Sequence, residues 1–368
     1  MIIRLVFGVA RRNRMRGMSL IETMVGMTLG ILVSLIITQV WGVFENQKQR
    51  TVSATAGQAT GLLALTELEQ DVRSAGAGLT DSAAFNCGTI YSYYESGVVQ
   101  ISPVPAYSGS MGLAPVQIID GGAGPDTITV RRSSDFLGAV PATLTSAMPS
   151  SPAVIDVSNT SGFADGDVVL IVNAGGNCTV TQVTSVQVAA AKLQHNPGAS
   201  PTYNPSVAFQ NTNAWPAYVT GDKVMKVGQM ISRSYTVNAS NELTVRDDSV
   251  PTGSSTASLA SDIVMVKAQY GIADVGSQTV NAWVSPTVAS GWSVMTPVLL
   301  RRIKAVRVVI VARSAKLEAP GTTTVAPVAW PDAASPAIDL SANPDWQRYR
   351  YRTYQLVIPI RNVIWANV

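Results

Sequence analysis

The apolar residues of this chain form one long, uninterrupted run near the N-terminus. From Thr23 to Phe44, 22 successive residues carry no charged side chain. At about 1.5 Å of rise per residue, a helix of this length spans roughly 30 Å, which is the thickness of the hydrocarbon core of a bilayer. The pattern therefore predicts a transmembrane helix over residues 18–44.

Residues 45–79 continue this helix with a one-sided apolar pattern. No proline occurs before Pro103, and the apolar residues recur at spacings of three or four. Such spacing puts them on one helix face, which we expect to pack on a sheet, and leaves the charged residues on the solvated side. Gly76 and Gly78 predict the end of the helix, because glycine adopts the backbone conformations of helix C-caps. The apolar stripe is Leu62, Leu65, Leu68, Val72, Ala75 and Leu79, and the charged residues are Glu67, Glu69, Asp71 and Arg73.

From residue 80 onward, short alternating runs replace the helical pattern. They are separated by Gly, Pro, Asn and Asp, which is typical of antiparallel strands joined by turns. The chain is therefore predicted to be α+β: a long N-terminal helix, half transmembrane and half amphipathic, packed on a β-rich, mainly antiparallel head of residues 80–368. We expect a variable inserted subdomain around 100–230, with surface loops near 141–152 and 196–216. The predicted strands are Thr127–Val130, Val168–Val172, Thr179–Val188, Met230–Val237, Glu242–Val245, Ile263–Tyr270, Ile303–Ser314 and Arg350–Asn362.

The run from Ile303 to Ser314 has one face that is nearly all apolar. Val306, Val308 and Ile310 share one face of the expected strand, because side chains two residues apart point the same way. We expect this apolar face to receive the apolar stripe of the helix.

A change of charge precedes the apolar run. Residues 1–17 contain five arginines and no acidic residue. By the positive-inside rule this end stays in the cytoplasm and the helix crosses outward. Glu22 lies at the cytoplasmic edge of the apolar run, where burial of an ionised carboxylate costs roughly 2.5 kcal/mol or more unless it finds a partner. The position of Glu22 therefore calls for such a partner.

Gly17, Met18 and Glu22 complete a recognisable arrangement: a basic leader that ends in glycine, a residue that can be N-methylated, a glutamate five residues after the glycine, and an apolar helix. This arrangement resembles the class III leader of type IV prepilins. The resemblance implies cleavage between Gly17 and Met18 by a prepilin peptidase, and methylation of the new α-amine of Met18. It also implies a partner for Glu22, because the family's glutamate neutralises the N-terminal amine of a neighbouring subunit in the filament.

Two other interpretations of the N-terminus stay open. A secretory signal peptide has an apolar region of about 7 to 15 residues followed by a small-residue cleavage site. Here the apolar run is longer, and the Ala-x-Ala match at Ala54–Ala56 lies beyond the polar residues 45–50. A single-span anchor without processing explains the apolar run, but it explains neither Gly17 nor Glu22.

Gly26 and Gly30 form a G-x-x-x-G within the membrane segment. This spacing lets two helix backbones approach closely. Either the glycines pack against other pilin helices, or they are two of the small residues that are common in such segments.

The last third of the chain carries a second resemblance. A strand that ends in a Tyr-Gly turn and is followed by an aspartate precedes a tryptophan, a basic strand and a closing Arg-Asn pair. This order, together with the end of the helix, looks like that of PilW-type minor pilins. J-type pseudopilins of type II secretion systems are similar at both ends but are usually much shorter, which favours the pilus family. The residues concerned are Ser261–Gly271, Asp274, Trp292, Ile303–Ser314 and Arg350–Asn362, with Asp71, Arg73, Ala75 and Gly76.

The charge balance depends on the leader. The whole chain has 26 Lys and Arg against 23 Asp and Glu, a net charge of +3; without the five leader arginines, 21 basic residues face 23 acidic ones, a net of −2. The bulk-charge argument for binding nucleic acid therefore disappears. Charged residues make up 13% and hydrophobic residues 46% of the chain, which suits an extracytoplasmic, β-rich protein.

Cys87 and Cys178 both lie on the oxidising side of the membrane in this topology. A disulfide between them would stabilise the fold by roughly 4 to 5 kcal/mol in the chain-entropy model. Two free or buried thiols are the alternative.

The sequence offers little for catalysis or metal binding. The single histidine, His195, lies in a loop rich in Pro and Asn and is expected to be solvated. One histidine excludes a multi-histidine metal site. Asp165 and Asp167 are better explained by a turn before a strand than by a calcium site, because the other ligands of an EF-hand loop are missing. We therefore expect no enzyme, no cofactor and no metal.

Arg348, Arg350 and Arg352 alternate with tyrosines, and this is the one stretch with the chemistry to recruit nucleic acid. As a strand, however, it would place the arginines on one face and the tyrosines on the other, which is ordinary for a half-buried strand. A nucleic-acid partner is therefore not favoured.

Taken together, the two resemblances imply a minor pilin that takes part in the assembly of type IV pili and is incorporated in the filament, supporting twitching motility or adhesion. Its expected partners are the prepilin peptidase, other minor and major pilins, and the inner-membrane assembly platform. It is expected to span the bacterial inner membrane once, with a periplasmic head, before it reaches the cell-surface pilus. A J-type pseudopilin and an unprocessed, membrane-anchored adhesin or binding module remain the alternatives.

Overall fold

The computed structural model of the chain gives a long helix and a β-rich region. The chain divides into two compact units, Met1–Ala54 and Thr55–Val368, and helix α1 (Leu20–Ser74) contributes to both. The predicted α+β class is confirmed. The residues that the structure describes are 19–79, 87, 89–91, 94–96, 99–101, 113–134, 140–148, 154–198, 203–204, 206–208, 216–228, 230–248, 255–293, 296–318, 321, 323–330 and 338–365.

Helix α1 has 55 residues and no internal proline. Its threonine hydroxyls are satisfied inside the helix: Thr23 donates to the carbonyl of Leu20 (2.8 Å), and Thr38 donates to that of Leu35 (2.9 Å). A hydroxyl that is bonded to its own backbone can enter an apolar environment at little cost.

The helix ends at Ser74, close to the predicted glycines. Gly76 and Gly78 have φ angles of 73° and 80°, in the left-handed region that glycine enters without strain. The turn is also tied to a strand, because the amide of Gly76 donates to the carbonyl of Arg131 (2.9 Å) and that of Ser133 donates to the carbonyl of Ala77 (2.8 Å).

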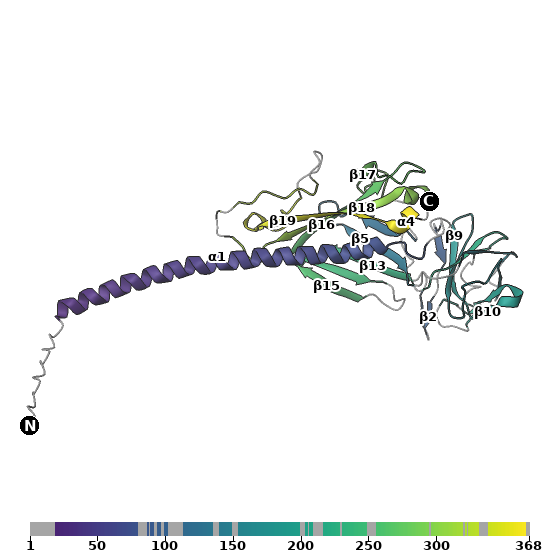
Figure 1. Cartoon of the computed structure of the whole chain (residues 1–368), viewed down its shortest axis with the longest axis horizontal. Helices are drawn as coiled ribbons and strands as arrows, with labels where there is room; N and C mark the ends of the chain where they lie inside the picture. The colour runs from purple at the N-terminus through teal and green to yellow at the C-terminus, as the bar shows by residue number, and fades with distance from the viewer. Residues whose placement is uncertain are drawn as a thin grey trace, which may run out of the picture. The chain divides into compact units, whose positions relative to one another are not determined.

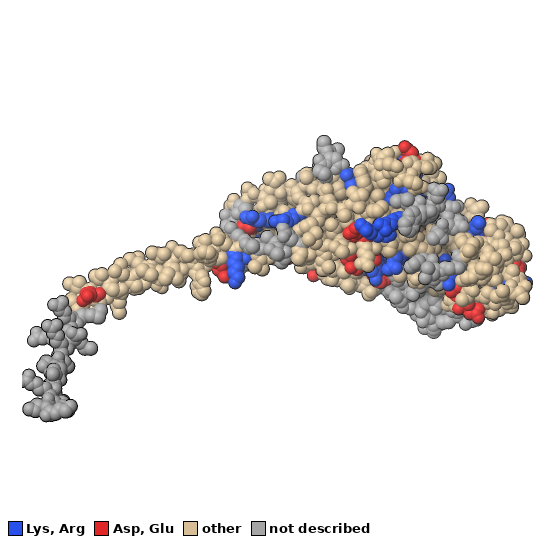
Figure 2. Space-filling model, in the orientation of Figure 1, with Lys and Arg blue, Asp and Glu red and all other residues tan. Residues whose placement is uncertain are grey.

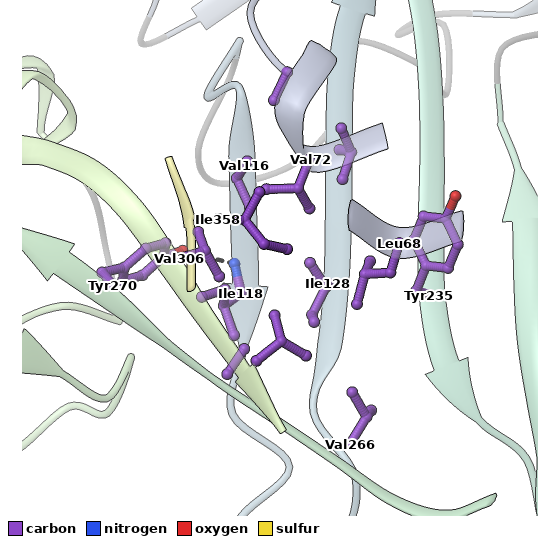
Figure 3. Packing of buried hydrophobic residues seen from close by; sticks show 14 of the residues in the cluster. Leu68, Val72, Val116, Ile118, Ile128, Tyr235, Val266, Tyr270, Val306 and Ile358 are labelled. Atoms are coloured by element: carbon purple, nitrogen blue, oxygen red, sulfur yellow. Dashed lines mark hydrogen bonds between the residues drawn. The ribbon is translucent and has the colours of Figure 1, made fainter. Parts of the chain in front are cut away.

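The second half of α1 lies along two sheets of the Thr55–Val368 unit (Figure 1). Ala64, Leu65, Leu68, Val72 and Ala75 are buried in one hydrophobic core with residues of both sheets, as the spacing predicted. Figure 3 shows Leu68 and Val72 of the helix among strand residues such as Ile128 and Val116.

Two members of the predicted stripe differ from expectation. Leu62 is 54% exposed, so its assignment to the buried face is wrong; Ala64, two residues later, is fully buried instead. Leu79 is buried, but in a different core, because the chain has already left the helix at Ser74.

The first sheet has the order β17-β16-β18-β19 and is antiparallel throughout. Val306, Val308 and Ile310 of its long strand β18 face the core that contains the helix, which confirms the predicted apolar face. The opposite face is also covered, since Val309 and Val311 belong to a second cluster that includes Trp330. The strands are β16 (Ile263–Ile272), β17 (Ala282–Val284), β18 (Ile303–Arg313) and β19 (Tyr351–Pro359), with the short helices α3 (Pro297–Arg302), η4 (Trp346–Arg348) and α4 (Arg361–Trp365) beside them.

The second sheet has the order β15-β14-β13-β5-β4, and all its pairings are antiparallel. It combines two early strands with three that follow much later, so residues 100–230 do not form one contiguous sheet of their own. The strands are β4 (Val116–Ile119), β5 (Thr127–Ser133), β13 (Met230–Val237), β14 (Glu242–Asp247) and β15 (Ser255–Ser261).

The remaining sheets draw their strands from residues 89–226. A five-stranded sheet, β1-β9-β8-β12-β6, has a hydrophobic cluster on each face, and the cluster on one face also includes residues of the three-stranded sheet β10-β11-β7. In addition, β2 pairs with β3. Only the pairing of β1 with β9 is parallel among the described strands. These elements are β1 (Thr89–Tyr91), β2 (Tyr94–Ser96), β3 (Val99–Ile101), β6 (Ala142–Thr143), β7 (Val154–Asp156), β8 (Val168–Val172), β9 (Asn177–Gln182), β10 (Ser185–Gln187), η3 (Val188–Ala190), β11 (Lys192–Gln194) and β12 (Lys223–Lys226).

Three sequence predictions about strands and loops need correction. The stretch 141–152 is not only a surface loop, because β6 lies within it and Leu144 and Met148 are almost fully buried. The predicted strand Thr179–Val188 is two strands, β9 and β10, separated by a turn. The closing Arg361–Asn362 pair begins α4 rather than ending a strand.

Candidate functional site: the exposed apolar helix and its attachment to the sheets

The first described residues of the chain form the start of α1. Gly17 and Met18 lie outside the described residues, so the predicted cleavage and methylation site stays a prediction. Glu22 lies in the first turn of the helix, and its amide donates to the carbonyl of Ser19 (2.9 Å). A carboxylate in this position interacts favourably with the positive end of the helix dipole, by about 0.3–1 kcal/mol. Among the described residues, no lysine or arginine forms an ion pair with Glu22.

The segment Leu20–Glu45 is long and apolar enough to cross a membrane, and it is the one such helix in the part of the chain that the structure describes. Its large apolar side chains are all exposed, from 49% for Val40 to 78% for Leu20. Figure 2 shows this stretch almost without charged side chains. An exposed apolar surface of this extent marks contact with a membrane or with other proteins.

Gly26 and Gly30 lie within this exposed segment. A Cβ atom added at either position would meet nothing within 4 Å. The chain's own fold therefore gives no reason for glycine at these positions, although glycine inside a helix costs about 1 kcal/mol relative to alanine. Whether they serve close packing against another helix stays a prediction.

Where α1 meets the sheets, a buried carboxylate joins the helix to β13. Asp71 is only 6% exposed; it accepts a hydrogen bond from the Tyr235 hydroxyl (2.5 Å) and one from the Arg233 guanidinium (3.3 Å). Burial, followed by the hydrogen bond to Asp71, raises the pKa of Tyr235 well above its ordinary value, so the hydroxyl stays protonated and donates. The expectation that Asp71 is solvated is therefore wrong. Its spacing from Leu68 and Ala75, three and four residues, was the available signal.

A second buried polar group lies within the second sheet, where Arg131 and Gln117 belong to the neighbouring strands β5 and β4. Arg131 of β5 is 4% exposed and donates to the Gln117 side chain (2.9 Å), and its burial lowers its pKa to about 10. The hydroxyl of Tyr270 accepts a hydrogen bond from the amide of Ile118 (2.6 Å), which links β16 of the first sheet to β4 of the second (Figure 3). The Tyr270–Ile118 hydrogen bond therefore ties the two sheets to each other.

The loop before β5 is held in a similar way. Asp126 is 2% exposed and accepts hydrogen bonds from the ammonium of Lys267 (2.7 Å) and the amide of Ala268 (2.9 Å), both on β16. Burial nevertheless raises its pKa above the ordinary value. No periodic pattern could indicate this contact, because its members are separated by more than 140 residues.

A comparison with known protein families found a match to the part of the chain that supplies Arg233, Tyr235, Lys267 and Tyr270. Residues 230–362 fit the family model PilW, described as type IV pilus-assembly protein W. This region of the chain is PilW-like. No curated protein and no solved structure matches the chain.

The PilW-like region begins at the first residue of β13 and ends in α4. It therefore contains Tyr235 and Arg233, the partners of Asp71, and the whole first sheet. The match of this region to the PilW family model suggests a non-enzymatic role related to type IV pilus assembly, which implies interaction with other pilus components. Together with the apolar helix, it suggests a membrane-anchored pilus protein.

A disulfide lies outside the PilW-like region. The structure joins Cys87, just before β1, to Cys178 in β9, across a sequence separation of 91 residues. Both cysteines belong to the same buried cluster as Leu79, which follows the end of α1. The bridge therefore ties the chain that leaves the helix to the five-stranded sheet.

The sequence predicted that His195 is solvated, and this prediction is wrong. It follows β11 directly and is 1% exposed; burial lowers its pKa to about 4. Among the described residues its Nε2 atom has no hydrogen-bond partner. The surrounding Pro and Asn residues indicated a loop correctly, but a loop residue can still point inward.

The carboxylates of Asp165 and Asp167 and the guanidinium groups of Arg348 and Arg350 have partners within the chain. Asp165 accepts a hydrogen bond from the amide of Val186 (2.7 Å), and Asp167 pairs with Lys226 (3.1 Å). No group of three or more potential metal ligands occurs among the described residues.

Arg348 and Arg350 do not lie in one strand with Arg352 as predicted, because β19 begins at Tyr351. Arg348 pairs with Asp345 (3.1 Å), and Arg350 pairs with Glu318 (2.7 Å). Neutralisation by carboxylates weakens the attraction of these arginines for phosphate.

Proposed function

We propose that this chain is a minor pilin that joins a type IV pilus. The observation that carries the proposal is the exposed apolar segment of α1, whose charge-free run Thr23–Phe44 directly follows Glu22, in a chain with a PilW-like region. In the proposed sequence of events, prepilin peptidase cleaves between Gly17 and Met18, and the new α-amine of Met18 is methylated. Before assembly, the chain spans the inner membrane once, with its N-terminus in the cytoplasm and its β-rich head in the periplasm.

During assembly, the helices of neighbouring pilins would replace the lipid that surrounds the apolar half of α1. The apolar side chains of Leu20–Glu45 would pack against the helices of neighbouring major and minor pilins, with Gly26 and Gly30 at close approaches. Glu22 would pair with the α-amine of Met18 on a neighbour, since both charges then leave water together and compensate each other. The head would be carried to the cell surface, where it supports pilus assembly, twitching motility or adhesion.

The Glu22→Ala variant tests this proposal. We expect the variant to remain in the membrane, because the apolar run is unchanged, but to be depleted in sheared pili by about thirtyfold or more, since the loss of one partner of a buried charge pair costs about 2 kcal/mol or more. Glu45→Ala is the matched control, since it removes the carboxylate at the other end of the apolar segment and should leave incorporation unchanged. Quantitative immunoblots of membrane and pilus fractions supply the measurement. Incorporation of Glu22→Ala at the wild-type level would contradict the proposed charge pair.

Two further measurements separate the alternatives. A mature chain whose mass begins at Met18, seen only when the prepilin peptidase is present, distinguishes a pilin or pseudopilin from an unprocessed anchored adhesin. Loss of surface pili and twitching upon deletion, with secretion intact, distinguishes the minor pilin from a J-type pseudopilin.

A further inference from the structure

A pocket open to solvent lies at one end of the first sheet, within the Thr55–Val368 unit. It has a volume of about 380 Å³, which falls in the range of small-molecule sites. Its lining comes from five separate segments: the loop before β5, the β13–β14 turn, the start of β16, the end of β18 and residues 339–351 up to the start of β19. None of these residues takes part in the proposed pilin assembly, so the pocket is a separate feature of the head.

The apolar part of the lining includes one aromatic ring. Val264, Met265, Leu340 and Tyr351 form this part, and the hydroxyl of Tyr351 donates to the carbonyl of Trp346 (2.8 Å). The ring is thereby held in one orientation, and it is half-buried where it lines the pocket.

The polar residues that line the pocket are already held by contacts within the chain. Arg313 donates to Asp262 (3.3 Å), and its guanidinium stacks 4.5 Å from the ring centroid of Tyr349. Opposite charge comes from Asp339, whose Oδ1 accepts a hydrogen bond from the amide of Ser341 (2.9 Å); a carboxylate can accept more than one such bond. The amides of Asn241 and Asn343 add both donors and acceptors.

The backbone departs from regular strand geometry beside this pocket. Val264 is the point at which the pairing of β16 with β18 shifts register, since Ile263 pairs with Ala312 and Met265 with Val311. Asn241 and Asp262 both have positive φ angles, 59° and 57°. Bulges that redirect a side chain are over-represented next to binding sites. These irregularities bring Val264, Asn241 and the partner of Arg313 to the same end of the sheet.

We propose that this pocket binds one ring of a neutral sugar. A sugar ring offers an apolar C–H face for the Tyr351 ring and hydroxyl pairs for carboxylate, amide and guanidinium groups. An anionic ligand is disfavoured, because Asp262 already neutralises Arg313 and Asp339 adds negative charge. An extended peptide is disfavoured as well, since the lining residues come from strand ends and loops and offer no length of sheet edge for pairing.

Saturation-transfer NMR on the full-length chain tests the proposal. The chain is held in micelles of a phosphocholine detergent, whose head group contains no sugar. The probes are the methyl glycosides of glucose, galactose, mannose, N-acetylglucosamine and N-acetylgalactosamine. We expect saturation transfer to the ring protons of at least one glycoside at millimolar concentration. This readout is independent of pilus assembly, so it separates failure of the sugar site from failure of the minor-pilin proposal.

Three variants sharpen the test. Asp339→Asn keeps the Oδ1 acceptor and removes the charge, and it should weaken binding on the order of fivefold to tenfold. Leu340→Arg should abolish binding, because the longer, charged side chain would occupy the pocket. Unchanged tryptophan fluorescence would show that this variant is folded. Asp274→Asn is the matched control: it changes an exposed aspartate on the β16–β17 loop outside the pocket, and its binding should equal that of the wild type.

Three results would overturn the proposal: no transfer to any of the five glycosides, equal transfer in folded Leu340→Arg, or displacement of the glycosides by a Val-Thr-Val tripeptide at lower concentration. If Leu340→Arg fails to fold, Asp339→Asn decides, and wild-type affinity in that variant counts against the pocket.

Discussion

Asp71 lies among the apolar residues of α1, and the side chains that satisfy its carboxylate come from β13. Removing an ionised group from water costs several kcal/mol unless hydrogen bonds replace its hydration. Tyr235 and Arg233 supply those bonds at 2.5 and 3.3 Å. Because apolar contacts alone tolerate sliding of a helix over a sheet, the charged contact also selects one position of α1 on β13.

The Tyr235→Phe variant tests the energetic weight of this contact. The substitution preserves the buried ring and removes the hydroxyl that donates to Asp71. A hydrogen bond to a charged group contributes about 1.5–3 kcal/mol, and we expect the free energy of unfolding to fall by about that amount. Urea denaturation of the full chain in detergent, followed by tryptophan fluorescence, measures it. Tyr349→Phe serves as control, since among the described contacts the Tyr349 ring stacks on Arg313 and its hydroxyl makes no hydrogen bond. Equal stability of the two variants would contradict the role of Asp71.

His195 makes the stability of the chain depend on pH. Its pKa is lowered to about 4 in the folded state by burial, against about 6.5 in the unfolded chain. Between these values the unfolded state binds more protons than the folded state does. The contribution of His195 to the free energy of unfolding is therefore complete above pH 6.5. It is lost as the pH falls toward 4, by about 1.4 kcal/mol per pH unit.

The chain contains one histidine, so His195→Gln isolates this effect. Urea denaturation at pH 7.5 and pH 5 should show a smaller loss of stability in the variant than in the wild type. The carboxylates titrate in both proteins and cancel in the difference. An identical pH dependence of the two proteins would show that His195 is solvated after all.

At the scale of secondary structure, a regular side-chain period could be predicted and contacts between distant segments could not. The helix, its end beside Gly76 and the strands over 127–130, 168–172 and 263–270 follow from periods of 3.6 and 2 together with turn residues. Leu62 and Asp71 were exchanged between faces because a helix stripe is broad and its edge is set by the sheet, not by the helix. Leu144 and Met148 were missed because isolated bridges within a Pro- and Ser-rich stretch leave no period.

Gly61 shows how an element can depend on a residue without a side chain. A Cβ atom added there would clash with Cε2 of the Tyr354 ring on β19. The absence of a side chain at Gly61 therefore lets the Tyr354 ring of the edge strand pack against the helix. At a solvent-exposed position the same change to alanine would stabilise a helix by about 1 kcal/mol.

We therefore expect the sign of Gly61→Ala to depend on Tyr354. In the wild-type background the variant should lose about 1–3 kcal/mol of unfolding free energy, as overpacked cores do. In a Tyr354→Ala background the same substitution should be neutral or stabilising, because the ring is gone. A double-mutant cycle by urea denaturation measures the coupling. Additive effects would mean that Gly61 and Tyr354 do not meet.

At the scale of the whole chain, the PilW-like region is not a self-contained core. The hydrophobic cluster that holds α1 takes Val116 and Ile128 from β4 and β5, and Leu68 and Val72 from the helix, all of them outside residues 230–362. The sequence could identify both ends of this arrangement, the helix and the late strands, because each carries its own pattern. It could not place β4 and β5 beside β13, since 100 or so residues separate them and sheet order leaves no local trace.

The disulfide acts on the fold of the whole chain, because this one covalent bond joins the segment that follows α1 to the five-stranded sheet of residues 89–226. Closing a loop with a sequence separation of 91 residues removes unfolded-state entropy equivalent to about 4–5 kcal/mol in the chain-entropy model. Either Cys87→Ala or Cys178→Ala breaks the bond, so each single variant should lose most of this stability, and the double variant should lose little more than either. Urea denaturation of the three variants measures these losses, and intact-mass analysis with and without reduction detects the bond itself. Additive single-variant losses, or two thiols that can be alkylated in the native protein, would instead identify two separate buried cysteines.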